Sequence, residues 1–171
     1  FDNSAYRQNP CMVLLPTNTE QVQAAVRLAR HYRLPLTARG RGTNTTGASV
    51  PVVNGAVVSF ERMNRFLAIN PGDRTAVVEP GVLNGDLQAA LAPHKLFWPP
   101  DPTSAPYCSI GGNIACNAGG PRAVKYGATR DNVLAIKAVT GTGELVEFGS
   151  NTSKNASGFD LSRLLIGSEG G

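Results

Sequence analysis

The chain has 171 residues, of which 42% are apolar, so it can bury a core and is not a disordered polymer. Lysine and arginine total 16 against 12 acidic residues, giving a net charge of +4, with no run of five basic residues and no basic residues interleaved with aromatic ones. This scattered charge argues against a nucleic-acid-binding surface and indicates a solvated exterior. A basic site for an anionic cofactor or substrate is the alternative.

Three cysteines, Cys11, Cys108 and Cys116, form no CxxC and have no metal-ligand spacing. The odd number argues against a disulfide framework and predicts a reducing, cytoplasmic compartment and no bound metal. No apolar run approaches the roughly 18 residues of a membrane span, and no signal-peptide pattern is visible. The chain starts without Met and stops at Gly171, so we expect a piece of a longer protein.

The first third of the chain predicts a strand, a helix and a second strand. Cys11–Pro16 is a short apolar run closed by proline, and Leu34–Ala38 is the next apolar run. Between them, Thr17 and Glu20 have the spacing of a capping box. Apolar residues then recur with the period of an amphipathic helix at Val22, Ala25, Val26 and Ala29. This unit predicts a βαβ crossover.

After Pro51 the pattern changes to hairpins and short helices. We expect a strand at 55–60, a hairpin at 66–81 around Pro71-Gly72-Asp73, and a hairpin at 133–148 around Gly141 and Gly143. A helix is predicted at 84–96, with Asn84 as its cap and Leu87 and Leu91 facing inward. The fold class is therefore α+β, a parallel α/β lobe at residues 1–52 followed by a larger lobe at 53–171 with antiparallel strands and helices.

The segment LPLTARGRGTNTTGASVP, at 34–51, places three glycines and many hydroxyl side chains directly after a predicted strand. It lacks the GxxxxGK[ST] of a Walker A loop, and its third glycine has the wrong spacing for GxGxxG. Such a loop is either a plain turn or an anion site built from backbone N–H groups.

A second unusual segment, Trp98–Gly127, is too long and too rich in proline and glycine for a plain connection. Ser109 is a candidate N-cap, and small residues that follow at helical spacing predict one flat face: Gly112, Ala115, Cys116 and Gly119. Tight helix-on-sheet packing is one explanation of that face. Two glycine-rich segments, one after a strand and one opening a helix, indicate instead a diphosphate held by backbone N–H groups.

Four motifs of the sequence are similar to motifs of a known family: PLTARGRGTNTTGASVP, INPGDRTAVVEPGV, PPDPTSAPYCSIGGNIACNAGGPRAVKYG and SGFDLSRLLIGSEG. The chain resembles the FAD-binding domain of the flavoprotein family that contains the FAD subunit of bacterial glycolate oxidase and the D-lactate dehydrogenases. That family has the PCMH-type fold of vanillyl-alcohol oxidase and p-cresol methylhydroxylase. The resemblance implies FAD bound between the two lobes, and a C-terminal cap domain beyond the 171 residues.

The resemblance also implies which residues bind each part of FAD. The loop Arg39–Gly47 would wrap the pyrophosphate, residues of the Pro100 segment would line the flavin end, and the turn at Gly111 would continue the cradle. Residues after Cys116 would run beside the ring system, Tyr126 and Gly127 would close the pocket, and Gly167–Gly170 would lie near the cofactor. The implied set is Arg39, Gly40, Arg41, Gly42, Thr43, Asn44, Thr45, Gly47, Pro100, Asp101, Ser104, Gly111, Gly112, Asn113, Cys116, Asn117, Gly119, Gly120, Tyr126 and Gly127.

The loop departs from the family pattern at Arg41, which stands where a glycine is usual. If Arg41 needed a positive φ, it would cost on the order of 1 kcal/mol, whereas as a cation it would lie beside the phosphates. The loop has no histidine, which excludes covalent flavin attachment through a loop histidine, and we expect FAD to be bound non-covalently. His31 and His94 read as surface residues.

The resemblance implies hydride transfer from a small 2-hydroxy acid to flavin. No catalytic base can be nominated, because neither cofactor segment contains a histidine, so the catalytic residues stay unknown and are expected beyond Gly171. Arg122 and Lys125 are candidates to stabilise reduced flavin or bind a carboxylate. Iron–sulfur or other oxidase subunits are possible partners, and a peripheral location at the inner membrane face is possible. Alternatives are another flavoenzyme of this fold, of the alditol oxidase or enolpyruvyl-sugar reductase type, and a non-catalytic nucleotide-binding module.

Overall fold

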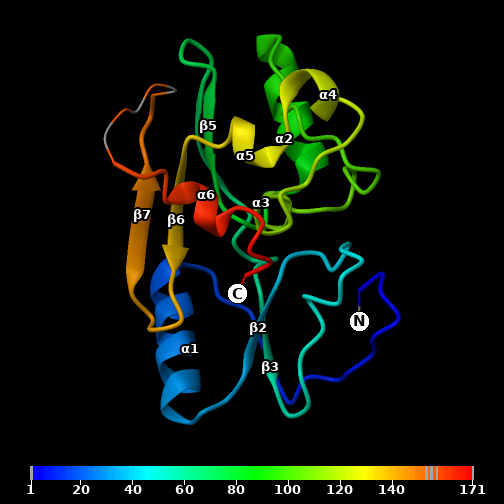
Figure 1. The fold of residues 1–171 in the computed structure, drawn as a ribbon, viewed down its shortest axis with the longest axis vertical. Helices are drawn as coiled ribbons and strands as arrows, with labels where there is room; N and C mark the ends of the chain where they lie inside the picture. Colours follow the sequence, from blue (N-terminus) through cyan, green and yellow to red (C-terminus); the bar gives the residue numbers. More distant parts are fainter. Residues whose placement is uncertain (1, 153, 155, 157, 171) are drawn as a thin grey trace.

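The computed structural model describes residues 2–152, 154, 156 and 158–170. Figure 1 shows two regions stacked along the long axis, one built around α1, β2 and β3 and the other around β5, α2 and α4. The short helix α3 and the C-terminal end lie where the two regions meet. Because α3 contains part of the second glycine-rich segment, the arrangement of the two regions sets the geometry of the predicted site.

The first region contains a parallel sheet of β1 (Val13–Leu14), β2 (Leu36–Arg39) and β3 (Ala56–Ser59) in the order β1-β3-β2. All four residues of β3 are buried, as expected for a central parallel strand. The predicted β1–helix–β2 unit is present, but β3 lies between its two strands and pairs with both. The sheet therefore continues beyond residue 52, where we expected the first lobe to end.

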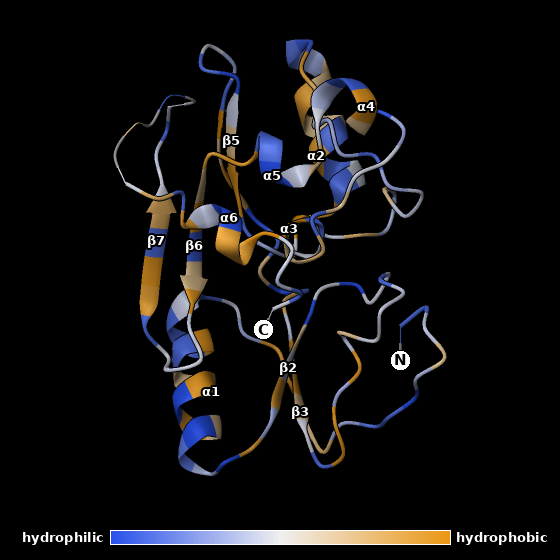
Figure 2. Ribbon diagram, in the orientation of Figure 1, coloured by the Kyte–Doolittle hydropathy of each residue, from blue (hydrophilic) through white to orange (hydrophobic). Residues whose placement is uncertain are grey.

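Helix α1 (Thr19–His31) forms the predicted amphipathic crossover and buries Val22 and Ala29. Figure 2 shows it as alternating hydrophilic and hydrophobic bands. Its cap differs from the prediction by one residue. The Asn18 side chain accepts from the Gln21 N–H at 2.9 Å, while Gln21 accepts from the Thr17 N–H at 2.8 Å. The interaction expected of Thr17 and Glu20 is thus made by Asn18 and Gln21, since an asparagine cap suits this position equally well.

The second region is built from two separate antiparallel hairpins. Strands β4 (Phe66–Asn70) and β5 (Thr75–Val78) pair with each other, as do β6 (Ala135–Val139) and β7 (Leu145–Gly149). Both predicted hairpins are therefore confirmed. Their turns are at the predicted places: the Arg74 N–H donates to Pro71 O at 3.2 Å, and the Gly143 N–H donates to Thr140 O at 2.9 Å.

The predicted helix at 84–96 is α2 (Asn84–Leu91), continued by the 3₁₀ turn η1 (Ala92–His94). Leu87 and Leu91 face inward, as predicted, and pack with Val82 and Ile110 in the core. The remaining helices are single turns or little more: α3 (Ile110–Ala115), α4 (Ala123–Tyr126), α5 (Thr129–Asn132) and α6 (Ser162–Leu165). No helix among the described residues is long and apolar enough to cross a membrane.

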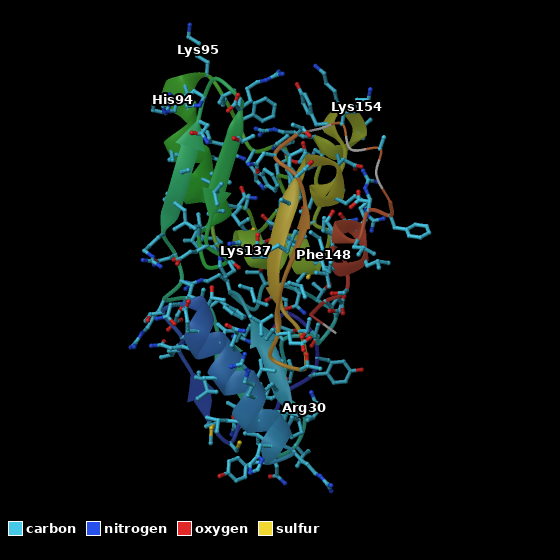
Figure 3. The ribbon with its side chains drawn as sticks, turned by 90° about the vertical axis from the view of Figure 1, so that its left-hand side faces the viewer. Arg30, His94, Lys95, Lys137, Phe148 and Lys154 are labelled. Atoms are coloured by element: carbon cyan, nitrogen blue, oxygen red, sulfur yellow. The ribbon has the colours of Figure 1, made fainter. Side chains whose placement is uncertain are left out.

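The two regions are joined at the turn of the β6–β7 hairpin. The carbonyl oxygen of Gly143 accepts from Gln23 Nε2 and from Arg27 Nη2, both at 3.0 Å, so α1 holds this turn. Figure 3 shows Lys137 and Phe148 on this hairpin, with Arg30 near one end of the molecule and His94 and Lys95 near the other. His31 and His94 are exposed, as expected for surface residues.

Candidate functional site

The two glycine-rich segments meet in space. Gly40, which directly follows β2, lies against the side chain of Ser109, and its Cα faces the Gly112 nitrogen, which would be 3.7 Å from an added Cβ. Ser109 is fully buried and caps α3 by accepting from the Gly112 N–H at 3.2 Å, as predicted. The structure therefore brings the loop 39–47 to the N-terminus of α3, which is the juxtaposition that the sequence could only suggest.

Backbone donors are unevenly available in these two segments. In the described part of the chain, the N–H groups of residues 41–46 donate to no acceptor. At α3, by contrast, the Ile110 N–H donates to Val82 O, the Gly111 N–H to Pro80 O and the Asn113 N–H to Ser109 O, at 2.8 to 2.9 Å. The turn 111–113 was expected to hold the anion through its own N–H groups. Because these groups already have partners, the loop alone offers free donors.

The N-terminal segment supports the loop 39–47 through Asp2. Asn44 Oδ1 accepts from Ser49 at 2.8 Å, and Asn44 Nδ2 donates to Asp2 at 2.8 Å and to Thr46 at 3.1 Å. The Asn44 side chain, expected to contact the cofactor, therefore serves the shape of the loop. The sequence did not lead us to expect a role for Asp2 in supporting the loop. The one local signal is its position in a turn, in which the Ser4 N–H donates to the Asp2 carboxylate at 2.8 Å.

Asp2 is a nearly fully buried carboxylate at 3% exposure. Burial raises its pKa, but hydrogen bonds from Ser4, Gly47 and Asn44 together lower the pKa by more than burial raises it. The pKa of Asp2 therefore lies below the usual 3.8. Asp2 is therefore ionised at neutral pH and holds the back of the loop as a charged acceptor. Charge-assisted hydrogen bonds of this kind are stronger than neutral ones, so the loop conformation is well fixed.

The two arginines of the loop differ in role. The Arg39 guanidinium lies against Gly42 and donates to Ser49 O at 3.4 Å, so it packs inside the loop. Arg41 is exposed and has no ion-pair partner among the described residues. The positive φ values of this loop, 65° and 88°, fall on Gly42 and Gly47 and not on Arg41. Arg41 therefore causes no backbone strain, and its charge is available to an anion.

Helix α3 is shorter than the small-residue pattern predicted. It ends at Ala115, and Asn117 adopts a left-handed φ of 45°. The N–H groups of Asn117 and Ala118 donate back to Ile114 O and Asn113 O, at 3.1 and 2.8 Å, which is a Schellman closure. Gly119 lies beyond this closure, so the predicted four-residue flat face does not form.

The adjacent glycines Gly111 and Gly112 face different surroundings. A Cβ on Gly111 would lie 2.7 Å from Pro80 Cβ and 2.9 Å from Pro80 O, so this glycine permits close packing. A Cβ on Gly112 would meet only the Ser109 hydroxyl, at 3.3 Å, within 4 Å. A side chain on Gly112 would therefore be tight against the Ser109 hydroxyl alone and would have room on its other sides beside the loop 39–47, whereas Gly111 is closely packed on Pro80.

The predicted flavin-end residues are tied to each other. Pro100 is buried, and Asp101 accepts from the Arg122 N–H at 3.1 Å and pairs with Arg122 Nε at 3.3 Å. Gly120, with a φ of 143°, packs directly on Asp101. Ser104 O accepts from the Tyr107 and Cys108 N–H groups, both at 2.8 Å. The segments 100–104 and 120–122 thus form one unit, in which Asp101 is a structural ion-pair partner.

Aromatic and basic side chains continue this unit. The Tyr126 ring packs edge-on against Phe97, with centroids 5.2 Å apart, and Lys125 lies over Tyr126 at 4.9 Å. Arg122 lies over Phe97 at 5.5 Å. Because Arg122 is committed to Asp101 and Phe97, Lys125 is the freer of the two cations that we considered for an anionic group. Gly127, with a φ of 78°, packs on Asp131 and ends α4.

The C-terminal segment lies along α3. The Gly167 N–H donates to Ile114 O at 3.0 Å, the Glu169 N–H donates to Ala115 O at 2.7 Å, and a Cβ on Gly170 would lie 3.5 Å from Ala38 on β2.

Burial, and secondarily the charge of Glu169, raises the pKa of the Cys116 thiol. Cys116 is therefore a neutral thiol at neutral pH, which argues against a reactive role.

Other candidate chemistry is absent from the described residues. They contain no group of three or more metal-ligating side chains. One cavity of about 340 Å³ lies between β7 and residues 158–163, and another of about 300 Å³ borders β1 and β3. Arg39 is the only predicted cofactor residue that lines either cavity. The open space at Gly112 and the free N–H groups of the loop are thus better guides to the site than these cavities.

The chain is similar in sequence to known FAD-binding proteins. Residues 10–149 match the family model described as "FAD binding domain". The chain is 44% identical over 167 residues to the glycolate oxidase subunit GlcD of Escherichia coli (strain K12), covering 98% of this chain and 33% of that protein. It is 40% identical over 164 residues to a D-lactate dehydrogenase of Anaerostipes hadrus, covering 96% of this chain and 34% of that protein.

Among solved structures, an alkyldihydroxyacetonephosphate synthase superposes with a TM-score of 0.80 at 28% identity, covering 92% of this chain and 29% of that one. The predicted α+β fold of the PCMH type is confirmed. The chain spans about a third of the length of the curated relatives that it matches. The chain therefore belongs to the FAD-binding domain family.

Proposed function

We propose that the chain binds FAD non-covalently, with the pyrophosphate on the loop 41–46. The observation that carries this proposal is the run of unpartnered N–H groups in that loop, directly beside Gly112, where the protein leaves room. A concave row of backbone N–H groups suits an anion, and the exposed Arg41 adds a positive charge. The loop contains no histidine, which supports non-covalent binding.

The site is asymmetric in a way that suits a dinucleotide. The loop and Gly112 would receive the pyrophosphate, and the tied segments 100–104 and 120–122 would define the flavin end. The other predicted contacts, Thr43, Thr45, Cys116, Asn117, Gly119, Tyr126 and Gly127, stay part of this proposal. When bound, FAD supplies the hydride-accepting chemistry, while these residues position it and exclude water.

We propose further that the whole protein is an FAD-dependent dehydrogenase of small 2-hydroxy acids. Glycolate and D-lactate, named in the relatives, share a hydroxyl group next to a carboxylate. No described residue of the site is a candidate base, so proton removal from the substrate hydroxyl is assigned to the part of the protein outside this chain. Lys125 is the candidate here for the substrate carboxylate, because Arg122 is paired with Asp101.

The name of one relative also supports a proposal about partners. GlcD is named as a subunit of glycolate oxidase, which supports further subunits for this protein, with an iron–sulfur subunit as our specific proposal. We also propose a cytoplasmic location, peripheral to the inner face of the membrane. The alternative functions, another flavoenzyme of this fold or a non-catalytic nucleotide-binding module, predict different substrates or no turnover.

The proposal is tested with the full-length protein in two steps. Visible absorption with release of the flavin into the supernatant on acid precipitation is expected, and flavin retained in the pellet contradicts non-covalent binding. Turnover of glycolate or D-lactate with an artificial electron acceptor is then expected at about 10 s⁻¹, a usual enzyme rate. A flavin-free protein contradicts the cofactor assignment. A yellow protein inactive on both acids points to the alternative substrates.

A further inference from the structure

Asn84 is the buried junction of the segments that carry the site. It is fully buried and is the first residue of α2, not the helix cap that we predicted, and the cap position falls on Leu83 without a side-chain hydrogen bond. The reason is tertiary: the segment 98–108 folds over the beginning of α2 and covers it. The Asn84 N–H donates to Cys108 O at 2.9 Å, and the Gly85 N–H donates to Ala105 O at 3.1 Å.

The amide of Asn84 bridges two segments that the proposed site needs at a fixed separation. Its Nδ2 donates to Pro100 O at 3.0 Å, on the flavin-end segment, and to Asn113 Oδ1 at 2.9 Å, on α3. Asn113 is itself buried, and its Nδ2 donates to Cys108 Sγ at 3.2 Å. One side chain therefore connects the flavin end with the helix that borders the pyrophosphate loop.

The same amide leaves one atom unsatisfied. Asn84 Oδ1 is buried and has no hydrogen-bond partner in the described part of the chain. A buried acceptor without a partner lowers stability. The two acceptors around Nδ2 fix the orientation of the amide, so Oδ1 cannot turn away. This arrangement favours placement of Pro100 and Asn113 over maximal stability of the core.

A second amide on the same face of α2 provides a comparison. Gln88, one turn after Asn84, accepts from the Trp98 N–H at 3.2 Å, and its Nε2 donates to Trp98 O at 2.5 Å. Gln88 therefore holds the same segment two residues earlier, but none of its hydrogen bonds reaches α3. Gln88 attaches the segment 98–108 to α2, whereas Asn84 also ties this segment to α3. Changing each residue in turn therefore distinguishes attachment of the segment from its placement against α3.

We propose that Asn84 is a positioning residue that sets the separation between the flavin-end segment and α3, and through it the orientation of the bound flavin. This inference rests on the proposed FAD site. Asn84 does not touch the cofactor, since its side chain is fully buried in protein. Its effect is transmitted through Pro100, on the flavin-end segment, and Asn113, on the helix that borders the pyrophosphate loop.

Asn84→Asp in the full-length protein tests this with little change in size. A carboxyl group at 84 faces Pro100 O and Asn113 Oδ1, two acceptors, at a fully buried position that favours the neutral acid. The neutral acid has a single O–H and can donate to only one of the two acceptors, so the bridge is lost. We expect the Kd for FAD, measured by flavin fluorescence titration, to rise about tenfold. The visible absorption and circular dichroism bands of the bound flavin should shift.

Gln88→Glu is the matched control, because it makes the same chemical change one turn further along. We expect its Kd for FAD to stay within about twofold of the parent and its flavin bands to be unchanged. Asn113→Ala breaks the bridge from the α3 side and should reproduce the band shift of Asn84→Asp. This second variant keeps the test decisive if Asn84→Asp does not fold, as judged by far-ultraviolet circular dichroism.

Three outcomes overturn the inference while the proposed FAD binding stands. If a folded Asn84→Asp protein matches the parent in Kd and flavin bands, or if Gln88→Glu has the same effect as Asn84→Asp, the bridge to α3 does not position the flavin. If Asn84→Asp is unfolded and Asn113→Ala binds flavin with parental bands, the inference fails as well. A parent protein that binds no FAD overturns the proposed function together with this inference, which distinguishes the two failures.

Discussion

Gly40 packs on the side chain of Ser109, so that the strand end leading into the pyrophosphate loop rests on the cap of α3. The contact is too close for a side chain on Gly40, because an added Cβ would overlap the Ser109 hydroxyl. Ser109 is fully buried, so its hydroxyl cannot swing into solvent. This contact fixes the distance between the loop that offers free N–H groups and the open space at Gly112.

Gly40→Ala should therefore destabilise the protein by about 1–3 kcal/mol, the usual cost of overpacking. In a Ser109→Ala background the obstructing hydroxyl is gone, and the same change should cost less. Ser109→Ala alone should cost about 1 kcal/mol through loss of the cap. Denaturant unfolding of the four proteins gives the coupling energy. Additive effects, within about 0.5 kcal/mol, would show that the contact is not as close as described.

Gly112→Val should abolish FAD binding while the fold persists. The added side chain meets one protein group within 4 Å, the Ser109 hydroxyl at 3.3 Å, which must shift by a few tenths of an ångström, so we expect the cofactor to be displaced and the core to persist. Gly111→Ala is the matched comparison, since its methyl group would strike Pro80 at 2.7 Å and should disturb folding first. Flavin fluorescence beside far-ultraviolet circular dichroism separates the two. Undiminished FAD binding by Gly112→Val would contradict the proposed placement.

The pyrophosphate loop should loosen in acid through Asp2. Its pKa is lowered on folding, so the stability it contributes is fully present above the usual 3.8 and is lost as the pH falls through the lower folded value. Asp2→Asn should cost about 1–3 kcal/mol at neutral pH, because an amide would point a donor at Asn44 Nδ2. Its unfolding free energy should also depend less on pH below about 4. Parallel pH curves for parent and variant would refute this role.

Arg33 offers a stabilising substitution far from the site. It ends α1 in a left-handed conformation, with a φ of 53°, and the Leu34 N–H closes the helix by donating to Ala29 O at 2.7 Å. Glycine is favoured at this position, so Arg33→Gly should stabilise by about 1 kcal/mol and raise Tm by about 2–4 °C. Arg33→Ala keeps the Cβ and should give no gain. Equal Tm values for the two variants would show that the backbone strain is not relieved.

Local features of the structure were predictable from the sequence. The apolar period of α1, the turns of both hairpins and the Ser109 cap all follow from residues within a few positions of each other. The family motifs supplied the cofactor class, since their order along the chain is characteristic. These features depend on backbone preference and short-range hydrogen bonding, which neighbouring residues decide.

Other features were decided only when distant segments came together. β3 lies between β1 and β2 because parallel pairing is a contact between residues far apart in the chain. Gly111 and Gly112 look alike in sequence, and only the position of Pro80 distinguishes packing from an open face. Asn84 is as good a helix cap as any asparagine until the segment 98–108 covers it, and its amide then finds one acceptor on that segment, Pro100 O, and one on α3, Asn113 Oδ1. The sequence alone determined which groups could bind FAD, whereas the tertiary structure decided which N–H groups stay free, because a donor is available only when no other segment has already supplied its acceptor.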